Sequence, residues 1–201
     1  MGFTFEARPV IFYIGVQMAL GLTTKLQAVN RIIATIGESP INSLSGQKRA
    51  DAVIAESVLD EVTVEVQARG WHFNTEKDVE LTPDSVSGEI AISTNVAKID
   101  LEAQNEGSLD VTIRKSKLYD LKEHTYIFTD AVKATVVYIL EFDEIPQAAR
   151  DYIAVRSARL FQDRMVGSKI LESFTLRDEF QTYAHFKQTE GDNADRTIFD
   201  N

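Results

Sequence analysis

The sequence contains no cysteine, and this absence excludes several kinds of chemistry at once. Disulfide bonds, cysteine nucleophiles, thiolate metal sites and iron–sulfur clusters all require the thiol group. Histidine is scarce as well: His72, His124 and His185 lie 52 and 61 positions apart. Two ligands on one helix face need a spacing of three or four. We therefore expect no metal site.

Motifs that bind cofactors or carry catalysis are also missing. The sequence has no glycine-rich phosphate loop, no Gly-x-Ser-x-Gly nucleophile elbow and no dinucleotide fingerprint. We expect no cofactor and predict no catalytic residue. Function has to be inferred from the organisation of the chain.

Basic residues are the minority among the charges. The chain has 21 Lys and Arg against 31 Asp and Glu, a net charge of −10 and a pI near 4.8. Such a field repels nucleic acid phosphates and anionic membranes at long range. The hydrophobic content of 44% is that of an ordinary folded protein, and 201 residues suffice for one domain with an insert.

Long hydrophobic runs are absent too. The longest, residues 10–22 (VIFYIGVQMALGL), has 13 residues, whereas a helix that spans a bilayer needs about 20. We expect no membrane insertion. A signal peptide is one interpretation, because Arg8 precedes the run, but no clean cleavage site follows. The alternative that we favour is a natural start at Met18, with residues 1–17 as an upstream extension or a loose arm.

The first half of the chain predicts two helices. Thr24 and Gln27 form a capping box, apolar residues follow at helical spacing, and Gly37 is placed to end the helix. A second helix is predicted over residues 48–69, with Glu56, Asp60 and Gln67 opposite its apolar face. Val53 and Val64 also fall on that polar side, as a subunit contact or as single exposed residues.

The period changes after Gly70, and short β segments separated by turn residues follow up to residue 145. The predicted segments are 79–81, 89–92, 111–114, 117–119, 125–128 and 134–142. The most strand-like is TVVYILEF, residues 135–142, rich in β-branched and aromatic residues. A small antiparallel sheet is expected.

Helical spacing returns at Pro146. One helix is predicted up to Gly167, and a second begins at Ser168, so that the two form an antiparallel hairpin. The sequence thus predicts an α+β protein: an antiparallel four-helix bundle, residues 18–70 and 146–189, with an inserted β domain, residues 71–145, between helices two and three. Residues 190–201 are polar and expected to be a flexible tail.

Charge is distributed unevenly between the predicted helices and the predicted β domain. Residues 71–145 hold seven Lys and Arg against fifteen Asp and Glu, a net −8. The third helix, in contrast, carries the arginines Arg150, Arg156, Arg159 and Arg164. Planar arginines suit bidentate pairing with a partner's carboxylates, whereas a solvated helix face with its own ion pairs would look the same in the sequence.

Three segments in this order resemble the tail tubular protein A family of short-tailed bacteriophages, also called head-to-tail adaptors or gatekeepers. They are LQAVNRIIATIGESPINSLSG at 26–46, QARGWHFN at 67–74 and DEIPQAARDYIAVRSARLFQDRMVG at 143–167. The resemblance extends from about residue 23 to residue 183 and is weakest inside the β insert.

The resemblance implies a structural protein of the virion tail, assembled in the host bacterial cytoplasm, with no catalytic residue. About a dozen copies would form a ring under the portal protein and help to retain packaged DNA. The tail nozzle protein, tail tubular protein B, would dock on the far side, with a tail fibre near that junction. DNA would leave through the lumen without specific binding.

In this context we expect Arg150, Arg156, Arg159 and Arg164 to contact another subunit or the portal. The loop Ser39, Pro40 and Ile41 is either a partner-binding loop or a fixed turn that packs Ile41. Gly70, Trp71 and Phe73 are expected to form structural core where the bundle meets the sheet.

Two other functional classes remain open. A tail-associated glycan hydrolase acting on capsule or peptidoglycan would need two carboxylates about 5–10 Å apart. The adjacent pairs Asp143–Glu144 and Asp178–Glu179 point apart on either a strand or a helix, so neither makes a site alone. A plain binding module would be a monomer.

Overall fold

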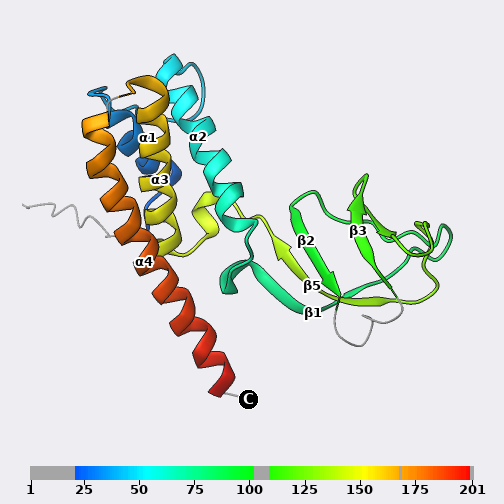
Figure 1. Ribbon diagram of the computed structural model, residues 1–201. Coiled ribbons are helices and arrows are strands. Elements are labelled where there is room, and N and C mark those ends of the chain that lie inside the picture. The colour runs from blue at the N-terminus through cyan, green and yellow to red at the C-terminus, as the bar shows by residue number, and fades with distance from the viewer. Residues whose placement is uncertain (1–20, 102–108, 168, 200–201) are drawn as a thin grey trace, which may run out of the picture.

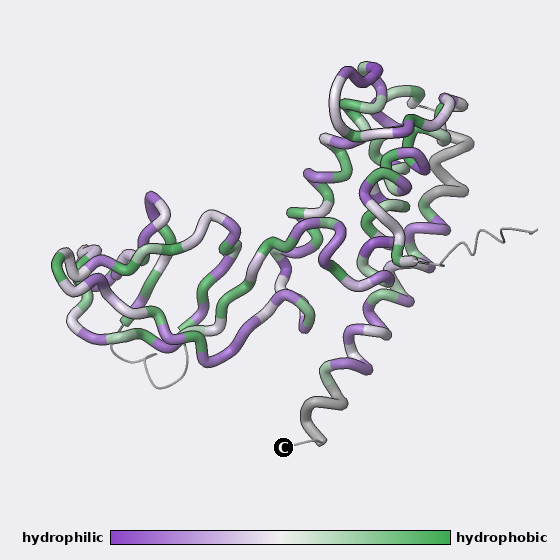
Figure 2. Tube along the Cα trace, turned by 180° about the vertical axis from the view of Figure 1, so that it is seen from behind, coloured by the Kyte–Doolittle hydropathy of each residue, from purple (hydrophilic) through white to green (hydrophobic). Residues whose placement is uncertain are grey.

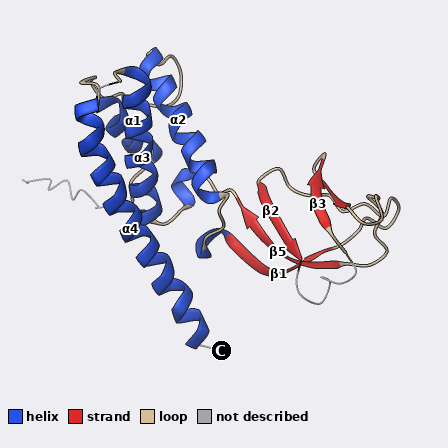
Figure 3. Cartoon of the chain, in the orientation of Figure 1, coloured by secondary structure: helices blue, strands red, loops and turns tan. Residues whose placement is uncertain are grey.

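The computed structural model describes residues 21–101, 109–167 and 169–199, with side chains left out at 169–175 and 195–199. The proposed extension 1–17 and the start at Met18 lie outside this range. Helices gather in one body and strands in a second, which Figure 3 shows side by side. We call these the helical body and the β domain. The predicted α+β class is confirmed.

Among the described residues, the helical body contains four α-helices. They are α1 (Lys25–Ala34), α2 (Ala50–Gln67), α3 (Gln147–Met165) and α4 (Lys169–Phe199). Helix α1 begins as predicted, because the Thr24 side chain accepts from Gln27 N while the Gln27 side chain accepts from Thr24 N. Figure 1 shows α3 among the other helices, with α4 extending past their ends.

Helix α3 packs against each of the other three helices, and α1 and α2 also pack on each other. Helix α4 packs chiefly against α3 and the short helix η1 (His72–Asn74). The four helices are therefore a packed set of three with α4 laid along α3. The antiparallel four-helix bundle of the sequence prediction is not confirmed. The buried apolar residues that α3 contributes include Ile153 and Phe161, both fully buried.

In the part of the β domain that the structure describes, five strands form two sheets. Strand β5 (Val132–Tyr138) lies between β1 (Thr75–Leu81) and β2 (Val96–Leu101), antiparallel to both. Strands β3 (Val111–Arg114) and β4 (Lys117–Asp120) form a separate hairpin. A second apolar core fills this domain and includes Ile90, Ile92, Leu118, Phe128 and Val132. Figure 2 shows the apolar residues running along the strands and helices.

Four of the predicted β segments lie in or overlap β1, β3, β4 and β5. Two others, 89–92 and 125–128, are not strands in the structure and make only isolated bridges such as Glu89 to Ile127. Strand β2 was not predicted. Its pairing with β5 shifts register between Val96 and Lys98, and this irregularity breaks the alternation that a sequence pattern needs.

The end of the chain differs from the prediction. Residues 190–199, expected to be a flexible tail, continue α4 to Phe199. The physical reason lies in two contacts of α4 with the segment after α2: Phe186 is fully buried, and the Glu190 carboxylate accepts a hydrogen bond from Phe73 N at 3.4 Å. These contacts anchor a polar stretch that has little apolar periodicity of its own.

The connection from α2 to β1 requires glycine at position 70. Gly70 has φ of +77°, and a Cβ there would lie 3.2 Å from Val137 Cγ2 on β5. A Cβ at this turn would therefore press against the Val137 side chain of β5, in a backbone conformation that glycine adopts without strain.

Substituting Gly70→Ala is expected to lower the free energy of unfolding by about 1–3 kcal/mol, because it adds a close contact to an unfavourable φ. Gly37→Ala is the matched control, since Gly37 has φ of +81° and a Cβ added there would meet no atom within 4 Å. Urea denaturation of both variants measures the difference. Equal losses would show that the approach of Val137 is not limiting.

Candidate functional site

The arginines of α3 form the most concentrated group of basic side chains in the helical body, and Arg150 is the most buried of them at 4% exposure. Its guanidinium donates to three backbone carbonyls, those of Ile145, Thr23 and Asp143. It thereby ties the chain before α1 to the chain before α3. Carbonyls inside the chain thus occupy the donors of Arg150, and its expected contact with another subunit or the portal stays a prediction.

Arg156 joins three helices. Its Nη1 donates to Glu179 of α4 at 2.7 Å, and its Nη2 donates to Glu65 of α2 at 2.8 Å. Arg159 donates to the other carboxylate oxygen of Glu179 and pairs with Asp163 at 3.1 Å. One carboxylate from α4 is thus shared by two arginines of α3.

Arg164 lies at the exposed end of the same group. It makes a bidentate pair with Glu61 of α2, at 2.9 and 3.0 Å. We call the set Arg156, Arg159, Arg164, Glu61, Glu65 and Glu179 the ionic ladder. Its pairs run from α2 across α3 to α4, so these arginines find carboxylates within their own chain. Their contact with another subunit or the portal stays a prediction.

The ion pairs with Arg159 and Arg156 lower the pKa of the Glu179 carboxyl. Burial by itself would raise the pKa of this carboxyl, but the hydrogen bonds from Arg159 and Arg156 outweigh burial and leave the pKa below its usual 4.5. The pKa of Glu61 is lowered as well, through its hydrogen bonds from Arg164. Charged carboxylates therefore stabilise the folded helical body.

The loop that contains Ser39, Pro40 and Ile41 is fixed by side chains on both flanks. The Asn30 amide donates to Ile41 O at 2.9 Å and accepts from Ile41 N at 2.8 Å, and Arg49 donates to Ser39 O at 3.0 Å. Ile41 packs against the core. These contacts support the interpretation of the loop as a fixed turn. Partner binding by the loop stays a prediction.

At the junction between the helical body and the β domain, Trp71 and Phe73 lie around Phe186 of α4. The sequence patterns did not point to Phe186. The Trp71 and Phe73 rings lie 4.3 and 6.3 Å from the Phe186 ring of α4, centre to centre. Trp71 Nε1 donates to Val66 O at 2.7 Å. Trp71 and Phe73 are partly buried and pack against the core of the helical body. The structural role of Gly70, Trp71 and Phe73 stays a prediction.

Two buried amides at the same junction were missed. Gln67 both donates to Leu140 O and accepts from Leu140 N at 2.9 Å, although the helical pattern placed it on the exposed face. Asn74 donates to Gln67 O and to Tyr138 O. Both residues occur in the QARGWHFN segment, which is the one signal that pointed to them.

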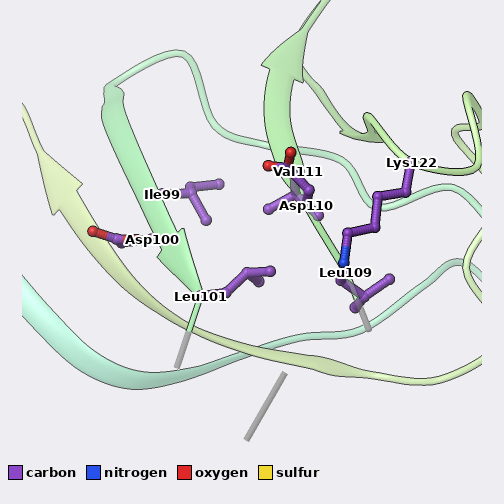
Figure 4. Close-up of a pocket in the computed structure, with 7 residues that line it drawn as sticks. All are labelled: Ile99, Asp100, Leu101, Leu109, Asp110, Val111 and Lys122. Carbon is purple, nitrogen blue, oxygen red and sulfur yellow. The ribbon is translucent and has the colours of Figure 1, made fainter. Parts of the chain in front are cut away.

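Neither Asp143–Glu144 nor Asp178–Glu179 supplies the two carboxylates that glycan hydrolysis needs. Glu179 is held by two arginines, and Asp143 accepts from Lys25 N. A hollow of about 320 Å³ lies between β2 and β3, and Figure 4 shows the side chains that line it: Ile99, Asp100, Leu101, Leu109, Asp110, Val111 and Lys122. Of its two carboxylates, Asp100 pairs with Lys98 at 3.0 Å. Nothing in this geometry favours the hydrolase.

Metal ligation and membrane crossing find no support in the part of the chain that the structure describes. No group of three or more Asp, Glu or His side chains there could hold a metal ion. Among the described helices, none is long and apolar enough to cross a membrane.

Comparison with known proteins matches residues 26–196 to the family model described as tail tubular protein. The chain belongs to the tail tubular protein family. It is also 28% identical over 131 residues to tail tubular protein A of Klebsiella phage KP34, covering 65% of this chain and 67% of that protein. The chain is therefore a structural component of a phage tail, located in the virion, and the family resemblance seen in its sequence is confirmed.

Substituting Glu179→Gln is expected to destabilise the helical body by about 1–3 kcal/mol near neutral pH, because two arginines lose a charged acceptor. Since folding lowers the pKa of Glu179, its contribution is complete above about pH 4.5 and is lost as the pH falls through the folded value. The difference in unfolding free energy between wild type and variant should therefore shrink in acid. Urea denaturation at several pH values measures it.

Asp178→Asn is the matched control, because Asp178 is the neighbouring exposed carboxylate on α4. It should change stability by less than about 0.5 kcal/mol at every pH. A wild-type advantage over Glu179→Gln that stays constant down to acid pH would contradict the stabilising role of the charged Glu179.

Proposed function

We propose that this chain is the head-to-tail adaptor of a short-tailed phage: a closed ring of about a dozen copies that joins the portal to the tail nozzle. The observation that carries the proposal is the extent of the family match. Residues 26–196 include all of α2, α3 and the β domain and all but the outer ends of α1 and α4. Membership thus concerns the complete two-body architecture and not one shared motif.

The proposed partners are the portal protein on one side of the ring, the tail nozzle protein on the other, and a tail fibre near the nozzle junction. A long joint of this kind needs stiff subunits, and the ionic ladder with the Phe186 contacts supplies stiffness in the helical body. We place the helical body and the end of α4 toward the portal, and the β domain outward or toward the nozzle.

DNA is a passenger in this proposal. The region 71–145, which includes the β domain, carries −8 of the net charge, and a ring multiplies it. A strongly negative wall repels phosphates, so DNA can be retained under the portal and later leave without contacts that would slow it. We infer that acidic side chains face the lumen.

Arg164 and the loop from Ser39 to Ile41 are the predicted contact residues that remain accessible. The Arg164 side chain is 48% exposed, and its partner Glu61 is 57% exposed. An exposed pair of this kind contributes little to stability and can exchange its partner for a carboxylate of another protein. Arg156 and Arg159 are more deeply held by Glu179.

The experiment that tests the proposal is to mix the purified chain with isolated portal particles and to view the product by electron microscopy. We expect a ring of fixed stoichiometry on one face of each portal particle. A chain that stays monomeric and leaves the portal particles bare would overturn the adaptor function and favour a plain binding module.

A further inference from the structure

Two chain segments cross between the helical body and the β domain, and two buried amides bind them together. Residues 68–74 lead from α2 to β1, and residues 139–141 lead from β5 back toward α3. Gln67 exchanges two hydrogen bonds, both at 2.9 Å, with the backbone of the second crossing, and Asn74 donates to Gln67 O and to Tyr138 O. We call Gln67 and Asn74 the amide clasp. Because both amides are buried and bonded to the backbone on each side, the clasp is a stable connection.

Helix α4 makes a further contact with this junction. Phe186 is fully buried, and its ring centre lies 4.3 Å from that of Trp71 and 6.3 Å from that of Phe73. One turn later, Glu190 accepts a hydrogen bond from Phe73 N. Since Phe73 belongs to η1, directly before β1, this attractive contact holds the β domain from the side of β1. We call residues 186–194 the α4 tether.

The α4 tether is held weakly beyond Phe186. Over residues 187–194 Glu190 is the one buried side chain, at 5% exposure. Its hydrogen bond from Phe73 N is long, at 3.4 Å, and its other carboxylate oxygen has no hydrogen-bond partner among the described residues. A buried carboxylate oxygen without a donor opposes docking, because it loses its hydration and gains no hydrogen bond in exchange. Docking of this segment is therefore only marginally favourable.

Gly191 weakens the same segment through the helix itself. It is an exposed residue inside α4, and a Cβ added there would meet no atom within 4 Å. Packing therefore does not require glycine at this position. Glycine in a helix interior disfavours the helix about fivefold relative to alanine. The end of α4 thus has a weak point next to Glu190, while its first half stays packed on α3.

The β domain has room to move on the other side of the junction. A cleft of about 520 Å³ is lined by Thr63 and Val64 of α2 and by Thr94 and Asn95, which precede β2. Between the described residues of α2 and these last two, no hydrogen bond or ion pair crosses the cleft. Strands β1 and β2 are the two edges of the sheet around β5, so the α4 tether holds one edge and the cleft lies beside the other. Figure 1 shows the far end of α4 on the β1 side.

We propose that the α4 tether is a releasable strap that sets the position of the β domain. While it is docked on η1, the cleft beside α2 stays open. When residues 187–194 leave η1, the β1 edge moves away from α4, and the β domain turns about the amide clasp toward α2. This movement narrows the cleft and buries Val64 and Ile139, two apolar residues that line it.

The β domain therefore has two positions relative to the helical body. A partner that binds the released end of α4 shifts the population toward the closed position. The strap acts within one chain and does not depend on the proposed ring.

Position 191 allows opposite changes at one exposed site. Gly191→Pro removes a helix hydrogen bond and places its ring against the carbonyl of Lys187, so it releases the α4 tether. Gly191→Ala favours the helix and keeps the tether docked. Because a Cβ at this position touches nothing, neither change disturbs the core of the helical body or of the β domain.

The absence of cysteine allows the position of the β domain to be measured on the full chain. Spin labels are attached to Ser57→Cys on α2 and Ala97→Cys on β2, both exposed, and double electron–electron resonance measures the distance between them. We expect one main distance in the otherwise unchanged chain and in Gly191→Ala. Gly191→Pro should give a distance shorter by about 5 Å or more. The control pair, Ser57→Cys with the exposed Gln181→Cys of α4, lies within the helical body and should give the same distance in all three chains.

Three results would overturn the proposal. An unchanged distance between positions 57 and 97 in Gly191→Pro would show that α4 does not set the position of the β domain. A longer distance would show that the β domain does not turn toward α2. A changed distance in the control pair would show that the end of α4 holds the helical body together and is no strap.

Discussion

Helix α3 is the element on which the helical body depends. It packs against α1, α2 and α4, and its arginines extend the same connections through ion pairs. Glu179 is the central partner, because one carboxylate accepts from both Arg156 and Arg159. Such shared, partly buried pairs are worth more than isolated surface pairs, since two donors and one acceptor fix each other's geometry. Without them α4 would rest on its apolar contacts and on the hydrogen bond from Phe73 N to Glu190.

The same arrangement links stability to the proposed assembly. A ring needs exposed surfaces that a neighbour can cover without stranding charges. The α2 carboxylates are numerous, yet Glu56, Asp60, Glu61 and Glu65 each have an intrachain partner. The acidic character of the chain is thereby divided: inside the helical body it is neutralised by arginine and lysine, and in the β domain it remains as net charge.

Much of the fold could be predicted from periodicity. The capping box at Thr24, the helices around 48–69 and 146–167, and the strand around 134–142 all follow local rules that a single sequence displays. Gln67 shows the limit of these rules. Its position on the helix is that of a polar residue facing solvent, but the backbone of Leu140, from a distant part of the chain, covers it and uses both ends of its amide.

The arginines show a second limit. Their number and spacing could be read from the sequence, but whether their partners were inside or outside the chain depends on how α2 and α4 lie against α3. Residues 190–199 show a third: their polar composition is typical of a loose tail, and a helix results because Phe186 and Glu190 dock against η1. Each miss concerns a contact between segments far apart in sequence, which local patterns do not encode.

A double-mutant cycle of Arg156 and Glu179 tests most directly whether these arginines stabilise their own chain. The free energy of unfolding of the wild type, Arg156→Gln, Glu179→Gln and the double variant is measured on the isolated chain in urea. We predict a coupling energy of at least about 1 kcal/mol, because each single change removes one of the two ion pairs that the partner side chain makes. Additivity within about 0.3 kcal/mol would contradict the account and return the arginines to an intermolecular role.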